Sequence, residues 1–325
     1  MPLDWFPLVE WMRDKDDFLL MTHIRPDADG LGSQMALADA LGRTGKKARV
    51  VIASKLPPRY EFLDPHRKII VNFELPGDEF RKCGGIVVMD TGTWNQLGDF
   101  GPWMKASKLP KVVIDHHRTQ DDLGGLAFVD TTAEATGRLS YEIIRALGAK
   151  ISPMAAHHMF MALALDTGWF RHPNTTAATF ALAAELVAAG AQPTPLYEQL
   201  FECASVARFK LVGLSLSRLQ VRCGGKIAFT DVRLSDYDAT GAVPGDTEDL
   251  INYPRSIEGV EMAMIFIEQP DGGTKVSFRA RSADVSKVAE KFDGGGHKLA
   301  SGARLPDDVD DAIVKVLAAC EEALR

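Results

Sequence analysis

The first half of the chain alternates short apolar runs rich in β-branched residues with helical patterns, and this alternation limits the fold more than any other feature. The expected strands are Phe18–Thr22, Ala48–Ala53, Ile69–Phe73, Ile86–Met89 and Val112–Ile114. Strands that alternate with helices are typical of an α/β fold, with a parallel sheet covered by helices on both faces. Ligands of such open sheets bind outside the carboxyl ends of the strands.

Beyond Val129 the pattern becomes helical and then mixed. Helices are expected at Ala135–Leu147, Pro153–Leu165, Thr176–Ala189 and Ser205–Leu219. Later strands are expected at Ile227–Val232, Met262–Glu268 and Lys275–Ala280, with helices at Val285–Phe292 and Val309–Leu324. Because Gly190, Pro193 and Pro195 follow a long helix and are typical of a helix stop, we expect an N-terminal domain over 1–190, a linker and connecting helix over 191–220, and a smaller α+β domain over 221–325.

The composition of the chain limits the kinds of substrate and binding partner that it can have. The 325 residues are 46% hydrophobic and carry a formal net charge of −7, so an extended basic face for long duplex DNA is not expected. The four cysteines form no close pair, no apolar run approaches bilayer length, and the N-terminus lacks a secretory pattern. These features predict a cytoplasmic protein without a membrane partner, whose anionic substrate is small.

Acidic and imidazole side chains cluster after the expected strands. His23, Asp27 and Asp29 follow the first strand, and Asp90 follows the fourth. Carboxylates and imidazoles together suit Mn²⁺ or a similar cation. A structural alternative stays open for Asp27 and Asp29, which could cap the next helix, and for Asp90, which could be a turn residue.

Two further clusters lie downstream. The triplet Asp115–His117 directly follows a buried strand, where an acid beside two imidazoles is hard to explain by packing. Asp166 ends an apolar helical stretch, and Arg171 comes five residues later. His157 and His158 are left out of this site, because adjacent residues of a helix point about 100° apart and cannot both face one metal.

Near the C-terminus, three glycines precede a histidine. Glycines after a helix are expected as C-cap residues, but Gly294–Gly296 followed by His297 exceed what capping needs. Glycines allow a nucleotide or phosphate to approach the backbone closely, and Arg279 offers a planar fork of donors to its oxygen atoms.

Together these motifs resemble the DHH phosphoesterases, a family named after the triplet Asp115–His117. The four N-terminal motifs occur in the family's order, and the stretch from Ser277 to Gly302 resembles the DHH-associated C-terminal domain. Length and ending are most similar to the bifunctional oligoribonucleases, or nanoRNases, that also dephosphorylate 3′-phosphoadenosine 5′-phosphate (pAp). Small departures such as Ala28 and Ser301 touch no ligand position.

The resemblance implies two divalent metals, Mn²⁺ first with Mg²⁺ or Co²⁺ as alternatives. It implies that His23, Asp27 and Asp90 bind one metal, and that Asp29, Asp90, His116 and Asp166 bind the other. Asp90 is then the bridge, His117 faces the substrate, and Asp115 orients its neighbours. Catalysis is assigned to Asp90, His116 and His117, and substrate binding to His117, Arg171, Arg279, Gly294, Gly295, Gly296 and His297.

The expected function is metal-dependent hydrolysis of short oligonucleotides, dinucleotides or pAp in a cleft between the two domains. The expected partner is a small nucleotide or a short single-stranded oligonucleotide, and a homodimer is compatible with the sequence. Alternatives are a cyclic-dinucleotide phosphodiesterase, a manganese pyrophosphatase, and a nucleotide-binding module without turnover. The filled ligand positions favour an enzyme over such a module.

Overall fold

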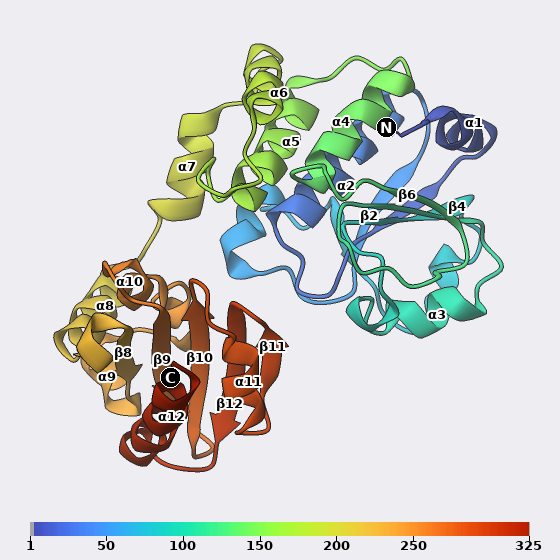
Figure 1. The fold of residues 1–325 in the computed structure, drawn as a ribbon. Coiled ribbons are helices and arrows are strands. Elements are labelled where there is room, and N and C mark those ends of the chain that lie inside the picture. Colours follow the sequence, from blue (N-terminus) through green and yellow to red (C-terminus); the bar gives the residue numbers. More distant parts are fainter. Residues whose placement is uncertain (1–2, 325) are drawn as a thin grey trace. The chain divides into compact units, whose positions relative to one another are not determined.

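The computed structural model describes residues 3–324, which form two compact units that divide between Cys203 and Ala204 (Figure 1). The helices of the first unit are α1 (Phe6–Asp14), α2 (Ala28–Arg43), α3 (Phe100–Ala106), α4 (Thr136–Ala146), α5 (Pro153–Asp166), α6 (Ala177–Ala188) and α7 (Pro193–Phe201). Its strands are β1 (Phe18–Met21), β2 (Ala48–Ile52), β3 (Ile70–Asn72), β4 (Gly85–Met89), β5 (Lys111–Asp115) and β6 (Leu126–Val129).

These strands form one sheet in the order β3-β2-β1-β4-β5-β6, and every neighbouring pair is parallel. The expected parallel sheet is therefore confirmed. The edge strand β6 was not expected from the sequence. Leu126 and Ala127 are exposed on it, so β6 lacks the continuous apolar run by which buried strands are recognised.

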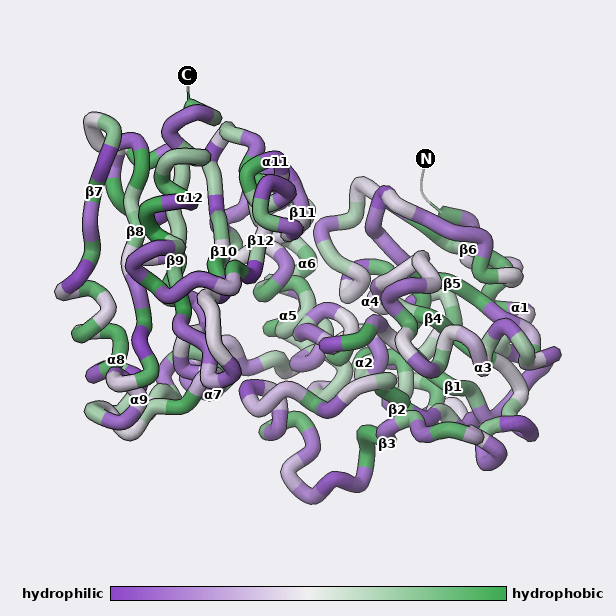
Figure 2. Tube along the Cα trace, turned by 90° about the horizontal axis from the view of Figure 1, so that it is seen from below, coloured by the Kyte–Doolittle hydropathy of each residue, from purple (hydrophilic) through white to green (hydrophobic). Residues whose placement is uncertain are grey.

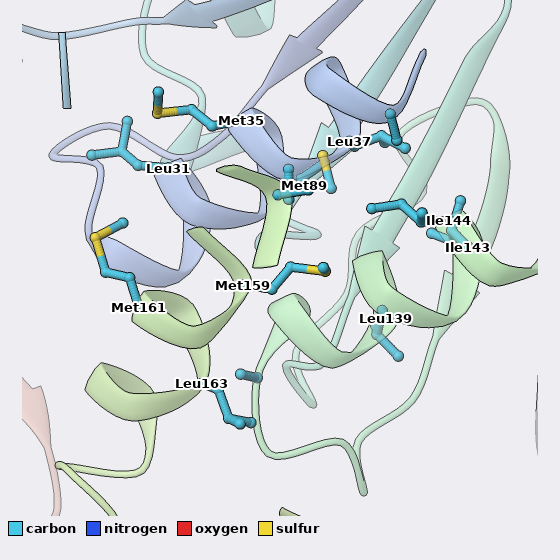
Figure 3. Packing of buried hydrophobic residues seen from close by; sticks show 14 of the residues in the cluster. Leu31, Met35, Leu37, Met89, Leu139, Ile143, Ile144, Met159, Met161 and Leu163 are labelled. Carbon is cyan, nitrogen blue, oxygen red and sulfur yellow. The ribbon is translucent and has the colours of Figure 1, made fainter. Parts of the chain in front are cut away.

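Two hydrophobic cores cover the two faces of this sheet. Alternate residues of β1 point to opposite faces, so Phe18 and Leu20 join one core while Leu19 and Met21 join the other. The first core packs β4 against α2, α4 and α5, as the labelled side chains from Leu31 to Leu163 show (Figure 3). The second core packs under α3. Helices therefore cover both faces, as expected.

The second unit contains α8 (Val206–Ser217), α9 (Leu234–Thr240), α10 (Asn252–Ser256), α11 (Val285–Glu290) and α12 (Val309–Ala323). Its strands are β7 (Gln220–Arg222), β8 (Ile227–Val232), β9 (Met262–Glu268), β10 (Thr274–Ala280), β11 (Gly295–His297) and β12 (Ala300–Leu305). The sheet order is β11-β12-β10-β9-β8-β7, with β8 and β9 parallel and the other pairs antiparallel. The edge strand β7 is mostly hydrophilic, whereas β8 is largely hydrophobic (Figure 2).

Helices lie on both faces of this second sheet. A core formed with α11 and α12 includes Val276 and Phe278 of β10. On the other face, α8 and α10 pack over β8 and β9, where Leu211 and Ile265 share a cluster. Side chains alternate between the two faces of a strand, so Arg279, next to Phe278, lies on the face of β10 opposite to α11 and α12.

The segment 191–220, expected as a linker and connecting helix, contains the two helices α7 and α8. Pro193 lies in the first turn of α7, where a missing N–H costs no helical hydrogen bond. Leu196 and Leu200 of α7 join the core of the first unit, whereas Leu211 of α8 joins a cluster of the second. Each helix thus has its own apolar stripe, and the units divide between residues 203 and 204.

Within residues 3–324, no helix combines the length and the apolar character that crossing a bilayer requires.

Candidate metal centre

The carboxyl ends of neighbouring strands bring the predicted ligands of the first unit together. His23 lies just beyond β1, Asp90 directly follows β4, and His116 directly follows β5. Asp29 lies in the first turn of α2 and Asp166 is the last residue of α5. Three groups within this set have ligand atoms that lie within 4.8 Å of one another: His23, Asp27 and Asp90; Asp29, His116 and Asp166; and Asp90, His116 and His117.

Backbone carbonyls orient the two inner imidazoles. The Nδ1–H of His23 donates to the carbonyl oxygen of Ile24 at 2.9 Å, and the Nδ1–H of His116 donates to that of Ala133 at 3.1 Å. Because a carbonyl oxygen only accepts, these contacts set the tautomer of both rings. In the neutral form of each ring, Nε2 is then the nitrogen with the lone pair, and it faces the carboxylates, as a metal ligand requires.

Asp90 stands between the two imidazoles. Its Oδ2 lies 3.5 Å from Nε2 of His23, while its Oδ1 lies 3.5 Å from Nε2 of His116. The side chain is only 2% exposed. One carboxylate thus offers a separate oxygen to each of two donor groups, which is the arrangement expected of a bridging ligand.

The remaining carboxylates complete the two groups. Asp27 Oδ1 lies 3.6 Å from Nε2 of His23. Asp29 Oδ2 and Asp166 Oδ2 lie 3.6 and 3.8 Å from Nε2 of His116. Asp27 also caps α2, because its side chain accepts hydrogen bonds from the backbone N–H groups of residues 29 and 30. The capping alternative is therefore correct for Asp27, and capping leaves the side chain inside the cluster.

The N-terminus of α4 holds two of these carboxylates. Asp29 accepts hydrogen bonds from the backbone N–H groups of Thr136 and Gly137, at 2.7 and 2.8 Å. The hydroxyl of Thr136 donates to Asp90 Oδ1 at 3.0 Å. Free N–H groups and the helix dipole favour negative charge at this position. The sequence analysis expected α4 but missed this contribution, although the Thr-Gly start of the helix was the available signal.

Asp90 also adopts an unusual backbone conformation. Its φ is +63°, in the left-handed region that residues with a side chain seldom adopt. Such a conformation costs of order 1 kcal/mol or more and persists only where surrounding contacts impose it. Here the turn aims the carboxylate back over the end of β4, between β1 and β5.

Burial and neighbouring charges shift the pKa values of these side chains. Burial raises the pKa of Asp90 well above its usual value, and the neighbouring Asp29 raises it further. Burial and Asp29 likewise raise the pKa of Asp166 to about 7. Burial lowers the pKa of His23, but Asp27 and Asp90 outweigh it and raise this pKa to about 11. The pocket therefore concentrates negative charge that a cation would stabilise.

The carboxylate oxygens and imidazole nitrogens of these groups determine which cations they can bind. Carboxylate oxygens suit Mg²⁺, Ca²⁺ and Mn²⁺, whereas imidazole suits transition metals, so the mixture fits Mn²⁺ better than Mg²⁺. The two rings have tautomers that leave Nε2 free, and Asp90 contributes to both groups. These residues could hold divalent cations.

The second imidazole of the triplet has different surroundings. The Nδ1–H of His117 donates to Asp115 Oδ1 at 2.8 Å, and the His117 side chain is 54% exposed. Burial raises the pKa of Asp115, but hydrogen bonds from His117 and Gln120 outweigh it and bring this pKa below its usual value. Asp115 thus holds the ring with Nε2 outward and raises the pKa of His117. Gln120 was not identified from the sequence.

The predicted substrate residues lie elsewhere. Arg171 is exposed, and its Nε donates to the carbonyl oxygen of Gly168 at 2.7 Å, in the loop after Asp166. Arg279 lies on β10 of the second unit, and Gly295–His297 form β11. Gly294 donates its N–H to Ala289 in the last turn of α11, so the C-cap alternative holds for this glycine.

Close pairing of β11 with β12 gives two of the glycines a structural reason. A Cβ on Gly294 would lie 2.3 Å from the carbonyl oxygen of Gly302, and Gly296 has a φ of +140° with the Ala300 carbonyl oxygen 2.7 Å from a Cβ. Gly295 differs, because a Cβ there would meet nothing within 4 Å. Strand pairing therefore does not explain why residue 295 is a glycine.

Both units of the chain are similar to known protein domains. Residues 17–165 match the N-terminal domain of the DHH family, and residues 224–325 match the DHHA1 domain. The chain is 28% identical over 312 residues to the bifunctional oligoribonuclease and PAP phosphatase NrnA of Bacillus subtilis, covering 94% of this chain and 96% of that protein. It is 30% identical over 307 residues to the NrnA of Thermus thermophilus, covering 94% and 89%.

A solved structure shows the same fold. An exopolyphosphatase-related protein of Bacteroides fragilis superimposes with a TM-score of 0.88 at 22% sequence identity, covering 98% of this chain and 94% of that one. The domain matches, the relatives and the acid and imidazole cluster lead to one assignment: the chain belongs to the DHH family of phosphoesterases.

Proposed function

We propose that this phosphoesterase hydrolyses short single-stranded oligonucleotides and pAp with two Mn²⁺ ions. The two NrnA relatives carry both activities in their names and match nearly the full chain. The net charge of −7 supports small substrates, because it provides no extended basic track for a long nucleic acid.

The position of Asp90 carries this proposal. Its two oxygens each lie 3.5 Å from an imidazole nitrogen of a different donor group. In this assignment, one cation is held by His23, Asp27 and Asp90, and the other by Asp29, Asp90, His116 and Asp166. When bound, such a pair of cations activates water and neutralises charge on the attacking and leaving oxygens of an in-line displacement.

The protein groups around the cations have separate roles in this proposal. The backbone N–H groups at the α4 N-terminus hold Asp29 in place and oppose the rise in its pKa that burial causes, and Thr136 orients Asp90. Because Asp115 raises the pKa of His117 and holds its Nε2 outward, His117 is suited to donate a proton or hydrogen bond to a phosphate oxygen. No protein nucleophile is required.

We assign substrate binding to residues outside the ligand groups. Arg171 follows the ligand Asp166 and is exposed, so it can contact substrate beside the first unit's cluster. In the second unit we assign substrate binding to Arg279, Gly294, Gly295, Gly296 and His297. Arg279 and His297 pair with the same residue, Ala300, from opposite sides, so both lie in one row across the sheet.

A substrate panel tests the proposal. Protein treated with a chelator is assayed with Mn²⁺, Mg²⁺ or Co²⁺ against a dinucleotide, oligonucleotides of increasing length, pAp, a cyclic dinucleotide and pyrophosphate. We expect turnover of the dinucleotide and pAp, highest with Mn²⁺, and none without metal. Preferential cleavage of the cyclic dinucleotide or of pyrophosphate would replace this function with the corresponding alternative.

A second measurement tests the number of cations. Calorimetric titration of the metal-free protein with Mn²⁺ should give two equivalents of Mn²⁺ bound per chain. A single equivalent with full activity would contradict the bridging role of Asp90.

A further inference from the structure

Among the carboxylates of the metal centre, Asp166 differs in how it is held. Asp29 accepts hydrogen bonds from backbone N–H groups at the start of α4, and Asp90 accepts one from the hydroxyl of Thr136. Asp27 accepts two from the start of α2. Within residues 3–324, the carboxylate of Asp166 accepts no hydrogen bond, and its side chain is 34% exposed; the donors near this residue reach its backbone carbonyl instead. The position of this ligand therefore depends on how the backbone at residue 166 is held.

The chain reverses its direction directly after α5. Gly168, Trp169 and Phe170 have φ values of +57°, +58° and +64°, a left-handed conformation that residues with a side chain seldom adopt. The next two backbone N–H groups, of residues 171–172, both donate to the carbonyl oxygen of Thr167 at 2.9 Å. The segment that follows is thereby brought back to the end of α5.

Aromatic packing holds this reversal in place. The ring centroid of Trp169 lies 5.0 Å from that of Tyr197 and 5.6 Å from that of Phe201, both on α7. The ring of Phe170 stacks on that of Phe180 of α6, with the centroids 5.3 Å apart. Left-handed residues with side chains persist only where surrounding contacts impose them. Contacts with α6 and α7 therefore fix the path of the chain after α5.

Asn174, at the end of this reversal, joins two segments of the metal centre. Its Nδ2 donates to the carbonyl oxygen of Asp166 at 3.3 Å and to that of Glu134 at 3.2 Å. A side-chain amide has two N–H donors, so each carbonyl receives one of them. Nδ1 of His172 lies farther from the Asp166 carbonyl oxygen, at 3.4 Å. Both N–H donors of Asn174 therefore hold backbone atoms, one of them at a metal ligand.

The carbonyl of Glu134 belongs to the segment that orients the other two ligands of this group. The carbonyl oxygen of its neighbour Ala133 accepts the Nδ1–H of His116. Two residues further on, the N–H of Thr136 donates to Asp29. The side chain of residue 174 thus connects the backbone of one ligand to the segment that holds the other two.

We propose that Asn174 is a positioning residue that sets the distance between Asp166 and the other ligands of its group, Asp29 and His116. This inference rests on the proposed function, because it concerns the cation that these three residues are assigned to hold. Loss of the two hydrogen bonds leaves every ligand in the chain but frees the backbone of Asp166 to move relative to His116. Residues that orient a metal ligand typically change metal affinity 10- to 100-fold when they are substituted.

Calorimetric titration of the metal-free full chain with Mn²⁺ tests this assignment. Asn174→Ala removes both donors, and Asn174→Leu removes them while keeping the size of the side chain. Asn174 is exposed, so neither change leaves a cavity in the core, and Asn72→Ala substitutes another exposed asparagine, on β3, as the control. In both Asn174 variants, one of the two equivalents should lose affinity about 10- to 100-fold, and the other should change by less than about threefold. Asn72→Ala should resemble wild type, and equal weakening of both equivalents in the Asn174 variants would overturn the inference.

Crystal structures of metal-free wild type and Asn174→Leu separate failure of this inference from failure of the proposed function. In the variant, the distance between Asp166 Oδ2 and Nε2 of His116, 3.8 Å here, should lengthen, while Asp90 Oδ2 should stay 3.5 Å from Nε2 of His23. If the wild type binds no Mn²⁺ or hydrolyses neither dinucleotides nor pAp, yet this displacement occurs, the proposed function fails and the positioning role stands. An unmoved Asp166 in the variant would overturn the inference, as would unchanged affinity for both equivalents where the wild type binds two.

Discussion

The two units hold charged side chains in opposite ways. In the first unit, Asp29, Asp90 and Asp115 are almost fully buried, and each has defined hydrogen-bond donors. In the second, Arg255 and Arg281 are exposed and Arg279 is half-buried, without a carboxylate partner in the described chain. The metal binding that we propose for the first unit needs a rigid second layer around its ligands, whereas the substrate binding that we propose for Arg279 needs a positive charge that no carboxylate neutralises.

The largest effect that this comparison predicts is at Asp90. Asp90→Asn should reduce kcat/KM at least about 1,000-fold while leaving the fold intact, because one carboxylate contributes to both donor groups. Kinetics, metal analysis and circular dichroism check this. Asp99→Asn, an exposed aspartate of the same unit, should behave as wild type. Near-normal turnover with full metal content in Asp90→Asn would show that Asp90 is not the bridge.

The histidines of the triplet should separate metal binding from catalysis. His116→Ala should lose metal, because its Nε2 lies between three carboxylates. His117→Ala should keep its metal and lose rate about 100-fold or more, because its Nδ1 is occupied by Asp115 and its Nε2 faces outward. Metal analysis of both purified variants decides this, and equal metal loss in the two would refute the division of roles.

Substituting a residue that donates a hydrogen bond to a metal ligand should have a smaller effect than substituting the ligand itself. Thr136→Val removes the hydroxyl that donates to Asp90 but keeps the size of the side chain. We expect a 10- to 100-fold loss of Mn²⁺ affinity or activity, as is typical for such outer residues. Thr132→Val, on an exposed turn, is the matched control. Unchanged Mn²⁺ affinity in Thr136→Val would mean that packing alone positions Asp90.

Substitutions in the second unit should act on substrate affinity. Arg279→Ala should raise KM for a dinucleotide about tenfold with little change in kcat and no loss of metal, because uniform binding is lost. Efficiency of the wild type should also stop rising after a few nucleotides of substrate length. A kcat/KM that climbs steadily to tens of nucleotides would favour a processive exonuclease.

The smallest effect concerns the stability of the first unit. Burial and then His157 lower the pKa of His158 to about 4, from 6.5. The unfolded chain therefore takes up a proton on this ring between pH 6.5 and 4 that the folded chain does not, so stability falls as pH falls through this window. His158→Leu should flatten this loss by up to about 3 kcal/mol, as measured by denaturation at pH 4.5 and 7. His66→Leu, at an exposed position, is the control, and identical slopes in wild type and His158→Leu would contradict the prediction.

Much of this molecule follows from local patterns in the sequence. Eight strands and six helices were predicted, because apolar runs and helical repeats are local properties of the sequence. Elements such as β6, β11 and β12 were missed, because Leu126 is exposed on an edge strand and Gly295 and Gly296 offer no hydrophobic pattern. They exist through pairing with strands already in place, and strand pairing is not a local property.

The candidate site divides in the same way. The sequence by itself determined which residue types follow each strand, and a parallel sheet must bring His23, Asp90 and His116 to one edge. Only the tertiary structure decided that the α4 N-terminus binds Asp29 and that Arg281 donates to the carbonyl oxygen of Arg255. These contacts join segments more than 20 residues apart, and their geometry depends on how helices pack on the sheets. The sequence therefore determines which residue types are available as ligands, whereas helix and sheet packing determines how these side chains are oriented and which charges lie beside them.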